Sequence, residues 1–186
     1  MNLELLKKPL PIENIDFRIQ SINKGWYATI LAYKDARVDM QRLDEAAWPL
    51  NWKRGHTRDN KNYIVSIYDE SKKEWVSKED TWTESMSEAE KWLASDSFKR
   101  ACFNWWIWRE LYDYPIIQVK LEQNDKKDMY WEWYIQWDKV KQWFWLKLKE
   151  WTWKSYFENW ELKALACKDQ NNKLRFSYWD INLLKK

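Results

Sequence analysis

The feature that most constrains this chain is a helical pattern over residues 85–115. Ser87 and Glu90 form a capping box, which predicts a helix start there. Apolar residues then recur at spacings of three and four along one face: Ala94, Phe98, Ala101, Trp105 and Trp108. At about 100° per residue, Lys99 and Arg100 fall far from this stripe. The pattern predicts one long helix with an outward-facing Lys-Arg pair, which a solvated helix face would also explain.

The segments before this helix have the alternation of strands. Period-two patterns predict a hairpin over residues 16–22 and 27–33, and Asp35 can cap a helix over residues 36–47. Turn residues then separate three further predicted strands, residues 51–58, 62–68 and 74–78. Hairpin, helix, three strands, helix is an α+β order. We therefore expect an α+β fold in which an antiparallel sheet, the hairpin plus the three-strand meander, packs against the long helix.

The length of 186 residues suits one domain with a small appendage. We expect residues 1–121 to form the core domain and residues 122–186 to form a C-terminal extension packed on it. The extension is predicted to be small and β-rich, with a terminal hairpin over residues 162–166 and 174–178. Trp, Tyr and Lys crowd residues 130–160, and their spacing does not separate helix from strand.

Several separated strings resemble one family. ASDSFKRACFNW and then RELYDYP are similar to the signature helix of the Rad fifty-two type of single-strand annealing protein, in particular its phage-type (Sak-like) members. Upstream, LAYKDARVDMQRLDE and PLNWKR continue the resemblance, which spans residues 15–115. Several blocks in the right order are more specific than any single short motif.

The resemblance implies a curved sheet against a long helix, and ATP-independent annealing of complementary strands in homologous recombination and DNA repair. Lys99 and Arg100 match the basic pair of the family's DNA groove, and Arg37 matches the arginine of its first helix. Lys53 and Arg54 are further basic candidates, because a row of cations on rigid elements follows phosphates without reading sequence. The implied partners are single-stranded DNA and further copies of the chain in a ring, with no cofactor.

The groove residues have one departure and several possible additions. Phe103 stands where some family members carry a third basic residue, so that part of the groove is expected to be built differently. Single-strand binders usually add aromatic platforms on which bases stack. Tyr63, Tyr68 and Trp75 are candidates, although core packing is the commoner role of any one of them.

Tryptophan stands at several positions where the family has glycine. These are Trp48, Trp82, Trp92, Trp106 and Trp108, and three more occupy turn-like contexts where glycine is expected: Trp26, Trp160 and Trp179. The chain has 18 Trp and only 2 Gly, against about 13 Gly at average usage. We hypothesise that the source reads the codon UGA as glycine. UGG codons at these positions would refute this, and the tryptophans would then be real.

Charge and composition limit the other classes of function. A net charge of +3 gives no global basic field, so a nucleic-acid site has to be a local patch. The first residues lack the apolar segment of a secretory signal, and no run is long enough to span a membrane. Cys102 and Cys167 are far apart and indicate reduced packing residues. We expect a location in the cytosol of a bacterium or a phage-infected host.

Enzymatic interpretations are weak, and no enzyme activity is expected. His56 is the only histidine, and neither a zinc set nor a phosphate loop is present in the sequence. Asp80, Glu84 and Glu88 could hold a metal for a nuclease, but turn and helix-start acids are the commoner role. Two alternatives stay open: a tryptophan-rich carbohydrate-binding module, and an interaction scaffold that does not bind DNA.

Overall fold

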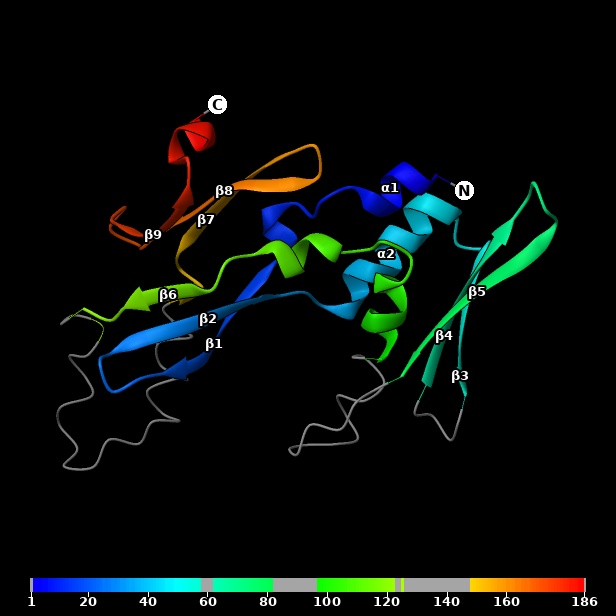
Figure 1. Ribbon diagram of the computed structural model, residues 1–186, viewed down its shortest axis with the longest axis horizontal. Helices are drawn as coiled ribbons and strands as arrows, with labels where there is room; N and C mark the ends of the chain where they lie inside the picture. Colours follow the sequence, from blue (N-terminus) through cyan, green and yellow to red (C-terminus); the bar gives the residue numbers. More distant parts are fainter. Residues whose placement is uncertain (1, 58–61, 82–96, 123–124, 126–147, 186) are drawn as a thin grey trace. The chain divides into compact units, whose positions relative to one another are not determined.

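The computed structural model describes residues 2–57, 62–81, 97–122, 125 and 148–185 (Figure 1). Within these residues the chain forms three antiparallel sheets of three strands each, together with a few short helices. The predicted α+β class is confirmed. Sequence neighbours pair in most of these ladders, as short turns between strands dictate.

The first sheet has the order β1-β2-β6. β1 (Asp16–Ile22) and β2 (Tyr27–Tyr33) are the predicted hairpin with the predicted bounds. β6 (Ile117–Lys120) is also antiparallel to β2 and pairs Val119 with Ala28. Phe17, Ala28, Ile30, Ile117 and Val119 are buried, so alternate residues of all three strands supply one apolar face.

The second sheet contains the predicted meander: β3 (Trp52–Thr57), β4 (Asn62–Asp69) and β5 (Glu74–Thr81), in that order. One face carries the buried side chains of Tyr63, Val65 and Ile67. Trp105 donates its indole N–H to the Val65 carbonyl at 3.0 Å, which ties this sheet to the segment after residue 97. The opposite face of β5 is exposed at every second residue, the pattern of a sheet that packs on one side.

The third sheet consists of β7 (Thr152–Glu158), β8 (Glu161–Lys168) and β9 (Leu174–Trp179). β8 and β9 are the predicted terminal hairpin, each slightly longer than expected. β7 lies in the segment whose spacing predicted neither helix nor strand. The central strand β8 buries Leu162, Ala164, Leu165, Ala166 and Cys167, which makes it the core of this sheet.

The helices are short. They are α1 (Leu3–Lys7), α2 (Ala36–Ala47) and the 3₁₀ helices η1 (Ile12–Asn14), η2 (Arg109–Asp113) and η3 (Ile181–Lys185). α2 has the predicted bounds, and the Asp35 carboxylate accepts the Arg37 N–H at 2.7 Å as its cap. Trp48 ends α2 at φ 71° and ψ 140°, close to a region that is essentially restricted to glycine.

The structure of the described residues contradicts two expectations, one about the sheet and one about the long helix. The hairpin and the meander belong to separate sheets, so they do not form one curved sheet. The described part of the predicted long helix is helical only over residues 97–103, and residues 104–108 form turns. The helix therefore stops before Trp105 and Trp108, which the stripe had included. Its predicted beginning at Ser87 lies outside the described residues.

Contacts divide the chain into two compact units. Unit 1 contains residues 1–10 and 34–109, and unit 2 contains residues 11–33 and 110–186. Unit 1 therefore holds α1, α2 and the sheet β3–β5, whereas unit 2 holds the other two sheets. The division into a core of residues 1–121 and an extension of residues 122–186 stays a prediction.

The backbone at the anomalous tryptophans is that of glycine. Nine described residues other than glycine have a positive φ, and six of them are tryptophans from the predicted set: Trp26, Trp48, Trp106, Trp108, Trp160 and Trp179. Neither glycine of the chain has a positive φ. This conformation costs a residue with a Cβ about 1–2 kcal/mol. Trp82 and Trp92 lie outside the described residues.

The turn between β7 and β8 is the most direct case. Glu158 pairs with Glu161, so Asn159 and Trp160 form a two-residue loop, and both have a positive φ. Two positive φ values in such a loop define a type I′ turn, for which Asn-Gly is the strongest sequence signal. The chain therefore has Asn-Trp where this turn favours Asn-Gly.

In the described part of the chain, no helix is long and apolar enough to cross a membrane.

Candidate nucleic-acid interface

The helix of residues 97–103 positions the predicted basic pair. Phe98, Ala101 and Cys102 are buried, whereas Lys99 and Arg100, which the stripe predicts to face outward, are half-buried. The two cations point to different neighbours. Arg100 donates to the Asp80 carboxylate of β5 at 3.3 Å, so an acid of the same unit already balances its charge.

The charge of Lys99 acts on a buried ion pair between Lys34 and Asp39, the second of which belongs to α2. Burial lowers the pKa of Lys34 to about 8, Asp39 opposes this, and the positive charge of Lys99 lowers the pKa further. Burial also raises the pKa of Asp39 to about 6 against the effects of Lys34 and Lys99. Lys99 therefore adds a second positive charge near the buried Lys34.

Arg54 reaches the same side of the unit from β3. It pairs in register with the buried Val65, so both side chains project from the face of the sheet that packs inward. Its guanidinium lies 3.7 Å from the Met40 sulfur of α2 and 5.6 Å from the centre of the Phe98 ring. The Arg54 side chain thus bridges α2 and the helix that carries Lys99.

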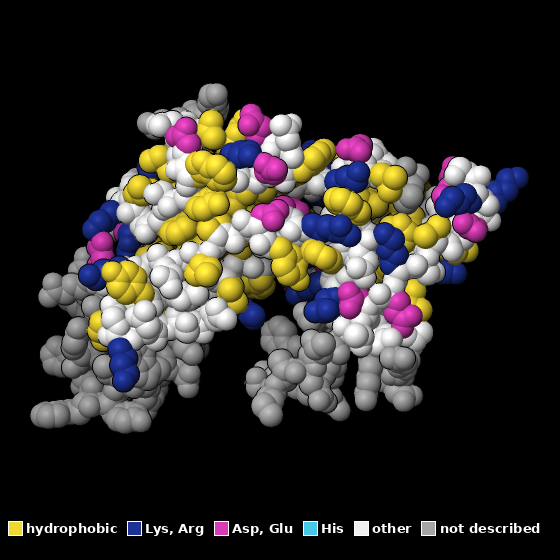
Figure 2. All heavy atoms as spheres, in the orientation of Figure 1, with side chains coloured by type: hydrophobic (Ala, Val, Ile, Leu, Met, Phe, Trp, Pro, Cys, Tyr) yellow, Lys and Arg dark blue, Asp and Glu magenta, His cyan; other side chains and the backbone are white. Residues whose placement is uncertain are grey.

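Arg37 occupies α2 one turn before Met40, and its side chain is 90% exposed. Residues three apart on a helix are neighbours on its surface. Of the five predicted cations, Arg54 therefore contacts both Met40 and Phe98, Arg37 lies three residues before Met40 on α2, and Lys99 directly follows Phe98 in the chain. Figure 2 shows Lys and Arg side chains among apolar ones over the part of unit 1 that contains α2. We call these three residues the Arg37–Arg54–Lys99 surface.

Lys53 lies elsewhere. Successive residues of a strand point to opposite faces, so Lys53 projects from the outer face of the sheet, in register with Ser66. Its ammonium lies 4.1 Å from the centre of the Trp75 ring, which meets Tyr68 edge to face at 5.4 Å. Of the predicted aromatic platforms, Tyr68 and Trp75 therefore lie on that outer face. Tyr63 is buried against Phe98 and belongs to the core.

A second group of cations follows the helix, and the sequence patterns did not indicate it. Arg109 donates from Nε to the Phe103 carbonyl at 3.1 Å, and its guanidinium lies 5.1 Å from the Phe103 ring. Lys78 donates to the Asn104 carbonyl at 2.6 Å. Burial lowers the pKa of Lys78, and the charge of Arg109 lowers it further. Positive charge thus lies beside Phe103, supplied from residues outside the helix itself.

The contacts of the remaining described candidates are as follows. His56 is exposed on β3 and meets Tyr63 edge to face at 4.2 Å. Asp80 is the acceptor of Arg100, and Glu84 and Glu88 lie outside the described residues. Among the residues whose structure is known, no group of three His, Cys, Asp or Glu side chains could hold a metal ion. Cys102 and Cys167 are free and buried.

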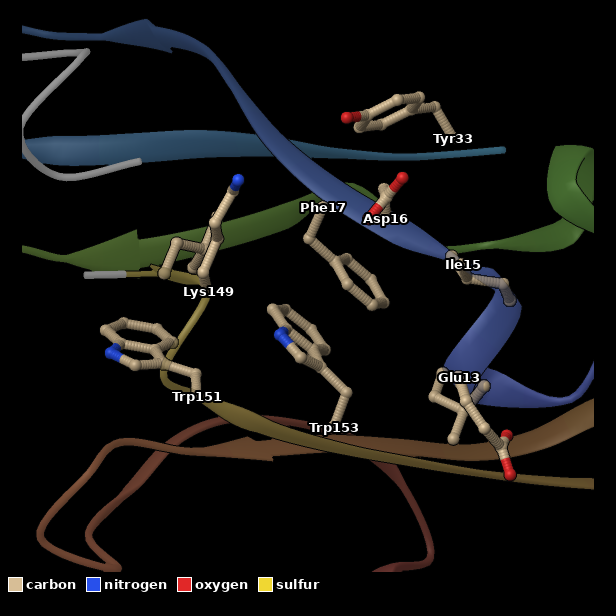
Figure 3. A pocket seen from close by; sticks show the side chains of 10 residues that line it. Glu13, Ile15, Asp16, Phe17, Tyr33, Lys149, Trp151 and Trp153 are labelled. Carbon is tan, nitrogen blue, oxygen red and sulfur yellow. The ribbon is translucent and has the colours of Figure 1, made fainter. Parts of the chain in front are cut away.

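Unit 2 contains a cavity of about 540 Å³ (Figure 3). Phe17 and Trp153 stack on one wall with ring centres 3.6 Å apart and planes within 6°. The polar residues around it include Glu13 and Asp16 against a single lysine, Lys149. Two acids beside one base do not favour a phosphate, so this cavity is a poor candidate for binding a DNA backbone.

The chain was compared with family models, with curated proteins and with solved structures, and nothing matches it. The family resemblance therefore rests on the sequence strings alone.

Proposed function

We propose that this protein binds single-stranded DNA along the Arg37–Arg54–Lys99 surface and anneals complementary strands without ATP. The observation that carries the proposal is the Arg54 side chain of β3, which contacts Met40 of α2, the helix of Arg37, and Phe98 of the helix that carries Lys99. The overall charge of +3 does not require cations on three elements to be connected in this way. Cations held on three rigid elements contact successive phosphates and leave the bases exposed for pairing.

The proposal has two further parts that follow from the resemblance. Several copies of the chain form a ring, because the surface of one copy contacts only a short length of strand. The protein works in the cytosol, in recombination and repair.

The test compares the Arg37–Arg54–Lys99 surface with the outer face of the sheet. The double variant Arg54→Ala with Lys99→Ala removes two proposed phosphate contacts, and Lys53→Ala removes a cation of the outer face. Binding to a labelled thirty-base oligothymidine is measured by fluorescence anisotropy over a range of salt concentrations. Each lost contact lowers the slope of log affinity against log salt by about 0.7. We expect the double variant to lose about 1.4 and Lys53→Ala to keep the slope of the unaltered protein.

The controls separate loss of binding from loss of folding and from other functions. Urea unfolding of each variant verifies that the mutated protein is folded. An equal loss for Lys53→Ala would move the site to the outer face of the sheet. Salt-dependent binding to a soluble polysaccharide in place of DNA would favour the carbohydrate-binding alternative.

A further inference from the structure

Trp106 lies in the turn that follows the helix of residues 97–103, with φ 71°. Its side chain is 49% exposed, so it fills little of the core. Its ring lies against two cations of unit 1. The Arg109 guanidinium is 4.1 Å from the ring centre, and the Lys7 ammonium is 5.2 Å from it. The indole thus covers two cations from a backbone position that disfavours it.

Within the described residues, the ion pairs of these two cations with acids are few and weak. Lys7 has an exposed partner, Glu4, at 3.8 Å, and an ion pair of that kind contributes little. Arg109 donates from Nε to a backbone carbonyl, and Lys78 adds a third positive charge close by. Like charges held together in this way favour an anion between them.

We propose that position 106 is a glycine position and that, with glycine there, Arg109 and Lys7 extend the phosphate-binding surface beyond the helix. This inference rests on the proposed function and adds two residues to it. Removing the indole takes a flat apolar cover from the guanidinium, whose remaining N–H groups then match two oxygens of one phosphate. Lys7 contacts a phosphate as a point charge.

The experiment compares Trp106→Gly with Trp48→Gly. Both positions have φ 71°, both side chains are exposed, and both belong to unit 1. Over the ring of Trp48, however, no Lys or Arg lies within the described residues. Oligothymidine binding over a salt range is measured for the unaltered protein, for both variants and for Trp106→Gly combined with Arg109→Ala. Urea midpoints verify folding.

We expect Trp106→Gly to bind more tightly, with a salt slope steeper by about 0.7 for one added contact and about 1.4 for two. Trp48→Gly keeps the original slope, and adding Arg109→Ala removes at least half of the gain. If the unaltered protein binds and Trp106→Gly binds with the same slope or more weakly, the inference is overturned while the proposed function stands. Weaker binding would mean that the indole itself stacks on bases. If none of the four proteins binds, both proposals fail.

Discussion

Each unit buries an aspartate beside a cation, and the two aspartates respond in opposite ways. In unit 1 burial dominates and raises the pKa of Asp39, although Lys34 is its partner. In unit 2 burial also pushes the pKa of Asp169 upward. The N–H groups of Lys173 and Asn171 and the Arg175 guanidinium outweigh this, and the net pKa is lowered. One cation does not compensate for burial, whereas one cation with several fixed backbone donors does.

The stronger cluster is also larger. The Arg175 side chain is 5% exposed and contacts Asp169 at 3.2 Å, Asp125 at 2.6 Å and the Lys120 carbonyl at 3.1 Å. It also lies over the Trp151 ring at 4.6 Å. This cluster joins the loop after β8 to the end of β6, which explains how the third sheet is held to the first within unit 2. The Lys34–Asp39 pair has no comparable set of donors in the described chain.

The largest expected effect comes from removing the central cation of unit 2. Arg175→Ala leaves two buried carboxylates without their partner and should lower the free energy of unfolding by about 3–5 kcal/mol. Lys173→Ala is the matched control, because its exposed pair with Glu122 is worth at most about 1 kcal/mol. Urea unfolding measures both. A loss below about 1 kcal/mol for Arg175→Ala would mean that the backbone donors alone hold the carboxylates.

The next effect concerns the pair in unit 1. Asp39 binds its proton more tightly in the folded protein than in the unfolded chain, so its contribution to stability decreases as pH rises from about 4 to 6. Lys34 binds its proton less tightly when folded, so its contribution increases from about pH 8 to 10. Replacing both with Lys34→Met and Asp39→Leu should therefore stabilise the protein most between pH 6 and 8, by on the order of 2 kcal/mol.

The measurement is urea unfolding of this double variant and the unaltered protein from pH 4 to 10. The difference between the two proteins isolates the pair from all other titrating groups. A difference that is constant with pH would show that burial does not shift either pKa. If the double variant is less stable than the unaltered protein at neutral pH, the Lys34–Asp39 pair stabilises the fold, as the Arg175 cluster of unit 2 is expected to do.

The smallest effect separates two turns of the same sheet. The loop after β8 holds Asn172 at φ 60°. In this loop the Asp169 side chain accepts hydrogen bonds from the backbone N–H groups of Asn171 and Lys173. The loop before β8 holds Trp160 at φ 69°, and its side chain is exposed. Trp160→Gly should raise the free energy of unfolding by about 1 kcal/mol, whereas Asn172→Gly should change it by a few tenths. Equal effects would show that the tryptophan is not strained.

The sequence predicted local structure well where side-chain period and turn chemistry agree. β1, β2 and α2 have the predicted bounds because alternation and the Asp35 cap define them locally. β7 was missed because Trp, Tyr and Lys fit an exposed strand and an exposed helix equally well. The separation into three sheets was also missed, because the pairing of β6 with β2 depends on contacts between distant residues.

The candidate site stays a prediction, and the sequence alone could not arrange its residues in space. Strand parity separates Lys53 from Arg54, whereas the contact of Arg54 with Phe98 depends on tertiary packing between distant segments. Arg109 and Lys7 were overlooked because only their contacts around Trp106 relate them to the helix. Asp39 was overlooked because a charged residue at a helix position normally indicates solvent, and only its tertiary partner Lys34 permits burial.

The order of the two units along the chain determines when each strand of unit 2 can pair during synthesis. β2 belongs to unit 2, and its partner β6 follows only after residues 34–109 of unit 1 have been synthesised. Because synthesis proceeds from the N-terminus, the β1–β2 hairpin lacks its β6 neighbour for as long as the residues of unit 1 are being added. That hairpin then exposes an unpaired strand edge during synthesis, which is a template for pairing with another chain. A slow stretch of translation after residue 109 would prolong this exposure, and rapid delivery of β6 would end it.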